Sequence, residues 1–486
     1  MDVLKNLFAA WAGEPCTECL ALGAGGSSRR YYRLSSNSRC CIGTVADDVR
    51  ENEAFFAFTY HFRAKDMPVP ELYVVADDRK HYLQQDLGDL TLYGLLYEKK
   101  RQGGGFDPEM MSLYRQALTD LAAIQQVGAD IDFSIAYPRA AFDSRSIHWD
   151  LNYFKYYFLK LANISFDEQR LEEDFDHLSE FLLQADCHYF LYRDFNPRNI
   201  MVVQRGEKGV QRPTADHPLS ALHYIDYQGG RRGAAQYDVA SLLFSAKSDL
   251  PDAYRNELLT HYLNIRQLHG SQRQQWLVYF WGYVLIRILQ TLGAYGFRGL
   301  YEKKEYFIQS IPLALRNLRN LIAEHSLPIE LPELQQALHR LTDSQLAAMP
   351  TSDIGNKLTV SIQSFSYKQG LPVDSSGNGG GHIFDCRALP NPGRYPQYQS
   401  YTGKDKPVIE FLAAEPAVSL FLNHSIGIVK QSVDKYLERH FTHLSVAYGC
   451  TGGQHRSVYC AEQLAKWLQT SYPEVQVELN HREQKT

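Results

Sequence analysis

Hydrophobic and polar positions change their spacing along the chain and divide it into three parts. From about 18 to 86, short runs such as RYYRL and CCIGTV, on either side of the turn SSNS, predict strands. MPVPELYVVADDRKHYLQQDL predicts two more strands joined by a turn. Between these pairs, ENEAFFAFTYHFRAK predicts an amphipathic helix with one apolar side, formed by Ala54, Phe55, Phe58 and Phe62.

From 89 to about 325 the spacing is mainly helical, with a strand-and-loop patch at 188–228. The clearest helical segments are 108–127, 142–163, 271–295 and 304–323. The most apolar run, WLVYFWGYVLI, is interrupted by Arg287 and Gln290. We interpret it as a core helix that is too short to cross a bilayer.

Residues 326–356 are polar and interrupted, which predicts a linker. Beyond 357, the strands LTVSIQSFSY, HIFDC, THLSVAYG and VQVELN alternate with two long amphipathic helices. This alternation predicts an α/β domain with a mostly parallel sheet, in which GNGGG at 377–381 is a flexible insertion. We therefore expect three regions, 1–325, 326–356 and 357–486.

Composition adds little that is specific. The formal net charge is −5, which gives no overall attraction to nucleic acids or anionic membranes. The first residues lack the basic and apolar regions of an export signal, and the eight cysteines are consistent with reduced thiols. We expect a cytoplasmic protein that does not associate with membranes.

Two short runs carry the chemistry of the first region. FLYRDFNPRNIMVV contains Asp194 and Asn199, and HYIDYQGG contains Asp226 at the end of a predicted strand. Phosphoryl transfer needs a carboxylate beside the attacking hydroxyl and oxygen ligands for Mg²⁺. Asp194 is the candidate catalytic base, and Asn199 and Asp226 are the candidate metal ligands. The alternative is that Asp194 and Asn199 only cap turns.

YRDFNPRNIM resembles the catalytic loop of aminoglycoside and choline-type phosphotransferases. The resemblance covers about 18–325 and implies an α+β protein-kinase-like bilobal fold, with a strand-rich N-lobe and a helical C-lobe, that uses ATP and Mg²⁺. Tyr192 stands where the family usually has histidine. Asp238 matches a family position that is usually structural.

The glycine-rich run GAGGSSRRYYRL is the candidate nucleotide loop, because glycines let backbone N–H groups approach phosphates. Its candidate phosphate-binding residues are Gly25, Gly26, Ser27, Ser28 and Arg30. Part of this run also resembles bacterial kinases of the superfamily that phosphorylate amino sugars of the cell wall, such as N-acetylmuramate and N-acetylglucosamine.

One departure from the kinase pattern concerns the strand CCIGTV. Kinases of this fold usually place a lysine there, paired with a helix glutamate, to hold the α and β phosphates. The strand has no lysine; Glu51 or Glu53 would supply the acid, and Arg30 is the nearest candidate cation. Arginine and lysine are not equivalent, so a degenerate, non-catalytic kinase lobe stays open as an alternative.

In the last region, VAYGCTGGQHRSV joins a predicted strand to a predicted helix through two glycines. Successive N–H groups and the helix start favour an anion, and Arg456 offers a bidentate contact to phosphate. The spacing from Cys450 to Arg456 is also that of cysteine phosphatases. The alternative is a plain glycine turn with a buried cysteine.

Five motifs, SFSYKQGLP, HIFDCRALPNPG, YTGKDKPV, GCTGGQHRSV and NHRE, resemble the C-terminal domain of RapZ proteins, bacterial RNase adaptors that bind small RNAs and sense glucosamine-6-phosphate. The resemblance implies a sugar-phosphate site. Its residues would be Cys450, Thr451, Gly452, Gly453, His455 and Arg456, with Asp385, Arg387 and Asn391 as neighbours. RNA binding is less well supported, because the region lacks a dense basic face.

The sequence thus favours an ATP-dependent sugar kinase whose C-terminal domain binds a sugar phosphate. Two other hypotheses remain at this point. One is a regulatory RNA-binding adaptor and metabolite sensor with a degenerate kinase lobe, and the other is a kinase–phosphatase fusion.

Overall fold

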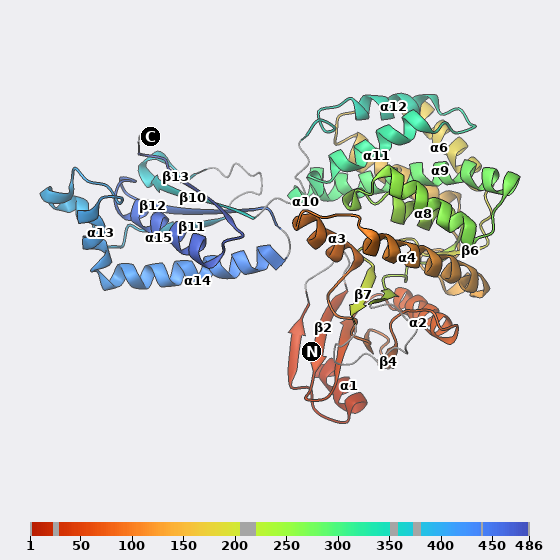
Figure 1. The fold of residues 1–486 in the computed structure, drawn as a ribbon, viewed down its shortest axis with the longest axis horizontal. Coiled ribbons are helices and arrows are strands. Elements are labelled where there is room, and N and C mark those ends of the chain that lie inside the picture. The colour runs from red at the N-terminus through yellow and green to blue at the C-terminus, as the bar shows by residue number, and fades with distance from the viewer. Residues whose placement is uncertain are drawn as a thin grey trace. The chain divides into compact units, whose positions relative to one another are not determined.

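The computed structural model describes residues 2–22, 29–204, 220–349, 358–372, 381–438 and 441–484. The chain divides into two compact units, Met1–Glu302 with Phe307–Thr351, and Lys303–Tyr306 with Ser352–Thr486 (Figure 1). Each unit has a hydrophobic core of its own.

An antiparallel sheet forms the N-lobe of the first unit, and the described residues give it five strands in the order β1-β2-β3-β5-β4. The strands are β1 (Glu18–Ala21), β2 (Arg30–Ser35), β3 (Cys40–Val45), β4 (Leu72–Val75) and β5 (His81–Gln84). The strands predicted on either side of SSNS are therefore confirmed as β2 and β3. Successive residues of a strand face opposite sides, so alternate positions share one face of the sheet.

Helix α2 (Val49–Ala64) packs against β4 of the sheet and against the short 3₁₀ helices Gly128–Asp130 and Phe133–Ile135 of the C-lobe. The Asp48 side chain caps it by accepting bonds from the backbone N–H groups of Arg50 and Glu51, which fixes where the helix begins. Its buried apolar side includes the four predicted residues. Helix α1 (Asp2–Ala12), which the sequence pattern did not predict, buries Leu4 and Phe8 against the sheet.

The C-lobe is helical, as predicted (Figure 1). Its main helices are α3 (Leu92–Arg101), α4 (Pro108–Val127), α5 (Ser144–Phe154), α6 (Glu168–Leu182), α7 (Gln236–Leu243), α8 (Asp252–Ile265), α9 (Gly270–Tyr295), α11 (Ile311–Glu324) and α12 (Pro332–Thr342). A short helix, α10 (Glu305–Ile308), precedes α11, and π-helical turns η3 (Lys155–Leu159) and η5 (Gly296–Tyr301) extend α5 and α9.

The core helix of the lobe is longer than the sequence suggested. Gly270–Tyr301 is long and apolar enough to cross a membrane by length and composition, so the expectation that it is too short was wrong. However, 56% of its most apolar window is buried inside the fold, where α9 packs against α5, α7 and α11. The interpretation as a core helix therefore agrees with the structure.

The segment 326–356 differs from the linker that its polarity predicted. Helix α12 lies inside it and packs against α6 and α11, burying Leu334, Leu338 and Leu341. The backbone N–H of Leu334 donates to Asp174 Oδ2 at 2.7 Å. Apolar positions at helical spacing between polar residues indicated this helix, but the prolines on either side of them favoured the prediction of a linker.

Two short ribbons fix the position of the loop that carries Asp194. Strand β6 (Tyr189–Leu191) pairs with β9 (Arg231–Gly233), and β7 (Ile200–Gln204) pairs with β8 (Ser220–Tyr224), both antiparallel. The run from 192 to 199 therefore connects two anchored strands, and Asp226 follows directly after the second ribbon.

In the second unit, the described strands form a parallel sheet in the order β11-β12-β10-β13. They are β10 (Thr359–Ser366), β11 (His382–Asp385), β12 (His443–Cys450) and β13 (Gln476–His481), with helices α13 (Lys406–Ala413), α14 (Pro416–Glu438) and α15 (Arg456–Ser471). The parallel α/β prediction is confirmed; most of the glycine-rich insertion at 377–381 lies outside the described residues.

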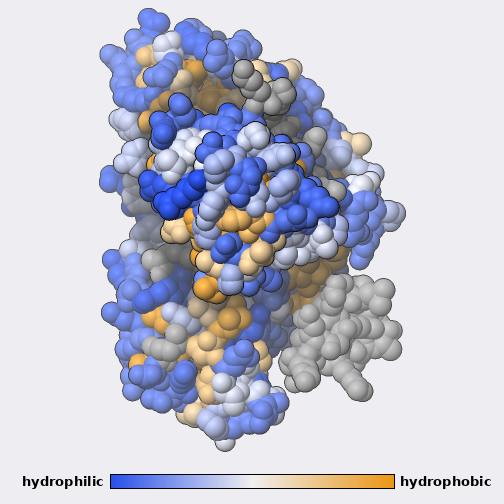
Figure 2. Space-filling model, turned by 90° about the vertical axis from the view of Figure 1, so that its left-hand side faces the viewer, coloured by the Kyte–Doolittle hydropathy of each residue, from blue (hydrophilic) through white to orange (hydrophobic). Residues whose placement is uncertain are grey.

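Hydrophilic side chains cover most of the face drawn in Figure 2, with smaller hydrophobic areas between them. On α14, Leu420 and Ile428 are exposed, at 57% and 46%. Exposed apolar side chains of this kind are normal on protein surfaces.

Candidate functional site

Asp238 on α7 fixes the position of the loop that carries Asp194. The carboxylate of Asp238 accepts bonds from the backbone N–H groups of Tyr192, at 2.7 Å, and Arg193, at 3.0 Å. Complete burial raises the pKa of Asp238 to about 7, and the two N–H bonds oppose this rise. The Tyr192 hydroxyl donates to the carbonyl of Ile225 at 2.6 Å. Tyr192, the residue found in place of the family histidine, thus ties the catalytic loop to the residue before Asp226.

Arg193 has a backbone φ of 84°, a conformation that costs a residue with a side chain about 1–3 kcal/mol. Its guanidinium offsets this cost by binding both carboxylate oxygens of Asp150, at 2.5 and 2.6 Å, and the hydroxyl of Tyr237 at 2.5 Å. These contacts, made by buried partners, hold the strained residue in place. The following side chain, Asp194, is directed away from the core and remains 47% exposed.

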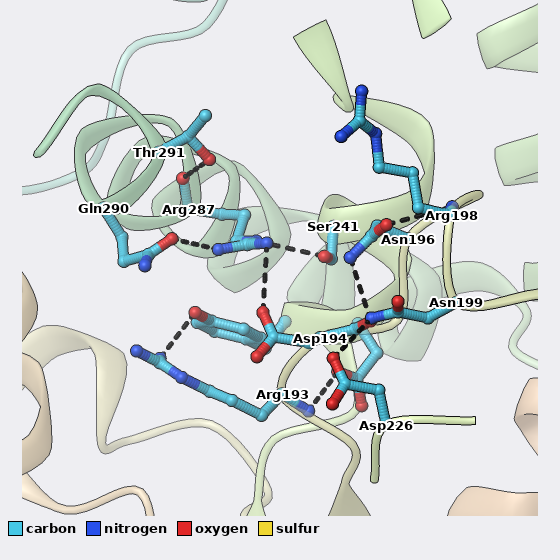
Figure 3. Close-up of polar contacts among 12 residues, drawn as sticks. Arg193, Asp194, Asn196, Arg198, Asn199, Asp226, Ser241, Arg287, Gln290 and Thr291 are labelled. Carbon is cyan, nitrogen blue, oxygen red and sulfur yellow. Dashed lines mark hydrogen bonds and ion pairs between the residues drawn. The ribbon is translucent and has the colours of Figure 1, made fainter. Parts of the chain in front are cut away.

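The structure brings the three predicted residues of the catalytic site together (Figure 3). The side-chain amide of Asn199 donates to the backbone carbonyl of Asp194 at 2.9 Å and to Asp226 Oδ2 at 3.0 Å. Gln228 Nε2 donates to the other carboxylate oxygen of Asp226 at 2.7 Å. Asp226 also has a positive φ, 72°. The amide and the carboxylate are therefore oriented by several bonds rather than by one.

Asp226 is accessible from the pocket that it lines, yet protein surrounds it on its other sides. This burial, followed by the negative charge of Asp194, raises the pKa of Asp226 to about 6. The bonds from Gln228 and Asn199 and the charge of Arg29 act in the opposite direction. A divalent cation at this point would relieve the repulsion between the two carboxylates.

The donor set fits Mg²⁺. Asn199 directs its N–H₂ group to Asp194 and Asp226, which leaves its carbonyl oxygen for other partners, and Asp226 adds carboxylate oxygens. In the described residues no group of three or more His, Cys, Asp or Glu side chains is arranged around a metal.

Arg287 on α9 is a residue of the site that the sequence interpretation did not assign. Its Nη2 lies 3.6 Å from Asp194 Oδ1, and its Nε donates to Ser241 Oγ at 3.0 Å (Figure 3). The signal was visible, because Arg287 interrupts the most apolar run of the chain. Only the fold shows that this interruption faces Asp194.

A pocket of about 570 Å³ lies between the sheet of the N-lobe and the catalytic loop. The lobe with the sheet contributes alternate strand residues, Arg29, Tyr31, Arg33, Ile42, Tyr82 and Gln84, as expected for one face of a sheet. The other side is formed by Asp194, Asn199, Met201, Ile225, Asp226 and Gln228. Gln85, Asp86 and Leu87, which follow β5, also line the pocket, and there Arg33 binds Asp86 through bonds of 2.6 and 3.0 Å.

The predicted nucleotide loop lies only partly within the residues that the structure describes. Gly25, Gly26, Ser27 and Ser28 lie outside the described residues. Arg30, the candidate cation, is not among the residues that line the pocket; it is exposed and lies 3.9 Å from Asp47. Its neighbour Arg29 lines the pocket instead and is almost fully buried.

In the second unit, β12 ends at Cys450 and α15 begins at Arg456, as the motif predicted. Cys450 Sγ accepts a bond from the Gly453 N–H at 3.2 Å and lies 3.1 Å from Ser457 Oγ. Gly453 has a φ of 69°, so the turn uses a conformation that favours glycine. Thr451 and Gly452 are exposed at the tip of this loop.

Arg456 is arranged differently from the phosphate contact that its spacing suggested. Its Nη1 donates to the backbone carbonyls of Arg387, at 2.7 Å, and Leu389, at 3.0 Å, and the residue is only 5% exposed. Arg456 Nε has no hydrogen-bond partner in the part of the chain that the structure describes. Much of this guanidinium therefore holds the segment 387–389 against α15.

The predicted neighbours of the loop fall into two groups. Asp385 and Arg387 form an exposed pair, with Arg387 Nη2 2.7 Å from Asp385 Oδ2, and Arg387 stacks over Tyr367. Asn391 Oδ1 accepts from the N–H of Gly393, and a Cβ added at Gly393 would lie 3.2 Å from the ring of His455. The Asn391 turn thus borders the loop directly.

One acid near this loop was not expected. A Cβ added at Gly453 would lie 2.6 Å from Glu483 Oε2, so this carboxylate packs against the turn. The backbone carbonyl of Glu483 accepts a bond from Gln454 Nε2 at 2.8 Å. The NHRE motif therefore closes one side of the loop that the preceding motif forms.

Comparison with known proteins places both units. The pattern of the family described as "Phosphotransferase enzyme family" matches residues 18–273, more than half of the chain. The chain belongs to the phosphotransferase enzyme family. Residues 358–485 of this phosphotransferase-family chain match the RapZ C-terminal domain.

Curated relatives of this family member match it over shorter stretches. A "nucleotide-binding protein" of Acidovorax sp. (strain JS42) is 44% identical over 110 residues, which is 23% of this chain and 37% of the relative. One of Delftia acidovorans is 35% identical over 172 residues, covering 35% of this chain and 54% of the relative. The chain thus spans about two fifths to half of the length of these relatives.

Among solved structures, ethanolamine kinase of Plasmodium vivax aligns at 12% identity with a TM-score of 0.43, covering 63% of this chain and 82% of that one. Choline kinase LicA of Streptococcus pneumoniae aligns at 13% identity with a TM-score of 0.41, covering 66% and 98%. A thermostable aminoglycoside phosphotransferase, solved with ADP and hygromycin B, aligns at 16% identity with a TM-score of 0.41, covering 67% and 100%.

Proposed function

We propose that this phosphotransferase-family chain is an ATP- and Mg²⁺-dependent small-molecule kinase that phosphorylates a hydroxyl of an amino sugar or another cell-wall sugar. The observation that carries the proposal is the convergence of Asp194, Asn199 and Asp226 on one pocket, with Asn199 bonded to both of the others. A turn-capping role would explain each residue alone but not their meeting in a pocket.

The residues divide the chemical step between them. Asp194 accepts the proton of the acceptor hydroxyl while the hydroxyl oxygen attacks the γ-phosphorus, and the bond from the γ-phosphorus to the leaving ADP oxygen breaks. Arg287, 3.6 Å from Asp194, helps to orient this carboxylate. Asn199 and Asp226 would hold Mg²⁺, which neutralises charge on the triphosphate.

The second part of the proposal concerns the RapZ-type domain, which we infer binds a phosphorylated sugar at the loop from Cys450 to Arg456. The support is the family match over 358–485 and the tight turn at Gly453, followed at once by the N-terminus of α15. A kinase that resembles amino-sugar kinases and a domain that resembles an amino-sugar-phosphate sensor would then act on related compounds.

A transfer assay tests the kinase proposal. The full chain is incubated with γ-labelled ATP, Mg²⁺ and a panel that includes amino sugars, N-acetylated sugars, choline and an aminoglycoside. We expect label on a sugar and none in the Asp194→Asn variant. Transfer to choline or to the aminoglycoside alone would overturn the sugar assignment, and no transfer to any compound, with MgATP still bound, would overturn the enzyme assignment.

A calorimetric titration tests the second part. Glucosamine-6-phosphate, N-acetylglucosamine-6-phosphate, glucosamine and inorganic phosphate are titrated into the full chain. Binding of a sugar phosphate that is stronger than that of phosphate or of the free sugar supports a sugar-phosphate site. Equal binding of phosphate and sugar phosphates would reduce the loop to a general anion site.

A further inference from the structure

We propose that Arg29 takes the place of the missing strand lysine and holds the α and β phosphates of the nucleotide. This inference rests on the proposed kinase function and adds to it the residue that grips the phosphates. The same observations assign Glu51 as the residue that positions Arg29.

The strand itself cannot provide the cation. The residue Ile42 of β3 lines the pocket, so Thr44, two positions later, shares its face of the sheet. Neither side chain carries a charge. On the neighbouring strand β2, Tyr31 stands directly opposite Thr44, and Arg29 lies two residues before Tyr31 on the same face. The cation therefore stands directly before the adjacent strand, β2, and faces the pocket.

Among the described residues, partners from two different elements hold Arg29. Its Nη2 and Nε donate to Glu51 Oε2 on α2, at 3.1 and 3.3 Å, and its Nη1 donates to the hydroxyl of Tyr82 on β5 at 3.1 Å. The side chain is only 2% exposed, whereas that of Glu51 is 31% exposed. A buried arginine held in one geometry, facing a pocket, loses little conformational freedom when it binds an anion.

The position of Arg29 relative to the metal ligands also fits. Arg29 and Asp226 line the same pocket, and the positive charge of Arg29 acts against the burial that raises the pKa of Asp226. In phosphoryl transfer, one cation on the inner phosphates and Mg²⁺ between the outer ones divide the charge of the triphosphate. Arg29 and Asp226 provide those two places in one pocket.

A second arginine–glutamate pair, formed by Glu53 on α2 and Arg79 between β4 and β5, serves as a matched control. Arg79 binds Glu53 through Nε at 2.5 Å and Nη2 at 2.7 Å. The side chain of Arg79 is 40% exposed, and Arg79 is not among the residues that line the pocket. Removal of Arg79 alone changes the charge of the N-lobe by the same amount as removal of Arg29, without touching the proposed phosphate site.

The test is calorimetric titration of the full chain with MgADP and, separately, with adenosine, which has no phosphate. For Arg29→Ala we expect the affinity for MgADP to fall about 10- to 100-fold, the range for loss of a charged hydrogen bond, while adenosine binding stays within twofold. Arg29→Lys should recover part of the loss, and Arg79→Ala should bind MgADP like the unaltered chain.

The outcomes separate the two proposals. If the unaltered chain binds neither MgADP nor MgATP, the kinase function itself fails. If it binds MgADP and Arg29→Ala binds it equally well, the role of Arg29 is overturned. Loss of adenosine and MgADP together would show a structural role instead. Should Arg29→Ala not fold, as judged by circular dichroism, the folded Arg29→Lys and Glu51→Gln variants decide: both must weaken MgADP more than adenosine.

Discussion

The pocket of the first unit and the loop of the second are both proposed to bind phosphate, but they are built from different parts. In the pocket, side chains from separate elements converge, and five of them carry charge: Arg29, Arg33, Asp86, Asp194 and Asp226. In the loop, the backbone between Cys450 and α15 forms the turn, and Arg456 donates hydrogen bonds to backbone carbonyl groups. A site made of side chains can hold a metal ion and transfer a proton. A site made of backbone N–H groups can bind an anion but has few groups that could take part in a reaction.

The largest expected effect is on the rate of phosphorylation, while ligand binding stays the same. Asp194→Asn keeps the shape of the side chain but removes the base, so we expect the rate of sugar phosphorylation to fall about 10²- to 10⁴-fold. The measurement is steady-state kinetics with the preferred sugar. Nucleotide affinity and sugar-phosphate binding at the second unit should stay unchanged; a fall in either would contradict independent sites.

Next in size is the dependence of metal binding on pH. The pKa of Asp226 is raised from 3.8 to about 6, so the carboxyl is protonated below about pH 6 and ionised above it. Mg²⁺ binds the ionised form, so its affinity should be constant above this pH and fall as the pH decreases through it, at about tenfold per unit. Titration of Mg²⁺ into the chain with ADP at several pH values measures this. An affinity that stays flat down to pH 5 would contradict it.

Sugar-phosphate binding by the second unit should be sensitive to one methyl group added to the turn at Gly453. Gly453→Ala adds a Cβ that meets Glu483 Oε2 at 2.6 Å and strains a residue with φ 69°, so we expect about a tenfold loss of sugar-phosphate affinity. Gly370→Ala is the control, because its φ is 79° but nothing lies within 4 Å of the added Cβ. Equal losses in both variants would mean that strain anywhere in the unit, and not the turn, weakens binding.

Arg456→Lys should mainly affect stability. A lysine cannot reproduce the two bonds from Nη1 to the carbonyls of Arg387 and Leu389, so we expect about 1–3 kcal/mol lower unfolding free energy for the second unit. Thermal unfolding with and without sugar phosphate measures this. A stability equal to that of the unaltered chain, with binding lost, would return Arg456 to the role of a direct phosphate contact.

The smallest expected effect tests Arg30, the cation that the sequence indicated for the phosphate site. Arg30 and Asp47 are 60% and 73% exposed and 3.9 Å apart, and exposed ion pairs contribute little. Arg30→Ala should therefore bind MgADP within twofold of the unaltered chain. A loss like the one expected for Arg29→Ala would show that the adjacent arginine contributes to the phosphate site.

The sequence was most informative where chemistry depends on local spacing. Asp194 and Asn199 share one short loop, and Asp226 stands between a predicted strand and two glycines. The three residues could therefore be predicted from the sequence as one candidate site. The helix and strand bounds around Gly453 followed from the same kind of local signal.

What could not be predicted depends on which distant residues meet. Either Glu51 or Glu53 could have paired with the cation, and the rotation of α2 decides that Glu51 faces Arg29 while Glu53 faces Arg79. Strand alternation likewise places Arg29, and not Arg30, in the pocket. The carbonyl contacts of Arg456 and the packing of α12 also require tertiary structure that residue spacing does not contain.

The hydroxyl of Tyr192 on the Ile225 carbonyl has a mechanical consequence. Together with the bond from the Ile225 N–H to the Asn199 carbonyl at 3.0 Å, it couples the loop that carries Asp194 to the segment that carries Asp226, so that both belong to one block within the helical lobe. Arg29 belongs to the sheet of the other lobe. Any hinge opening between the lobes would thus move Arg29, the proposed phosphate-binding residue, away while the proposed base and metal ligands keep their spacing.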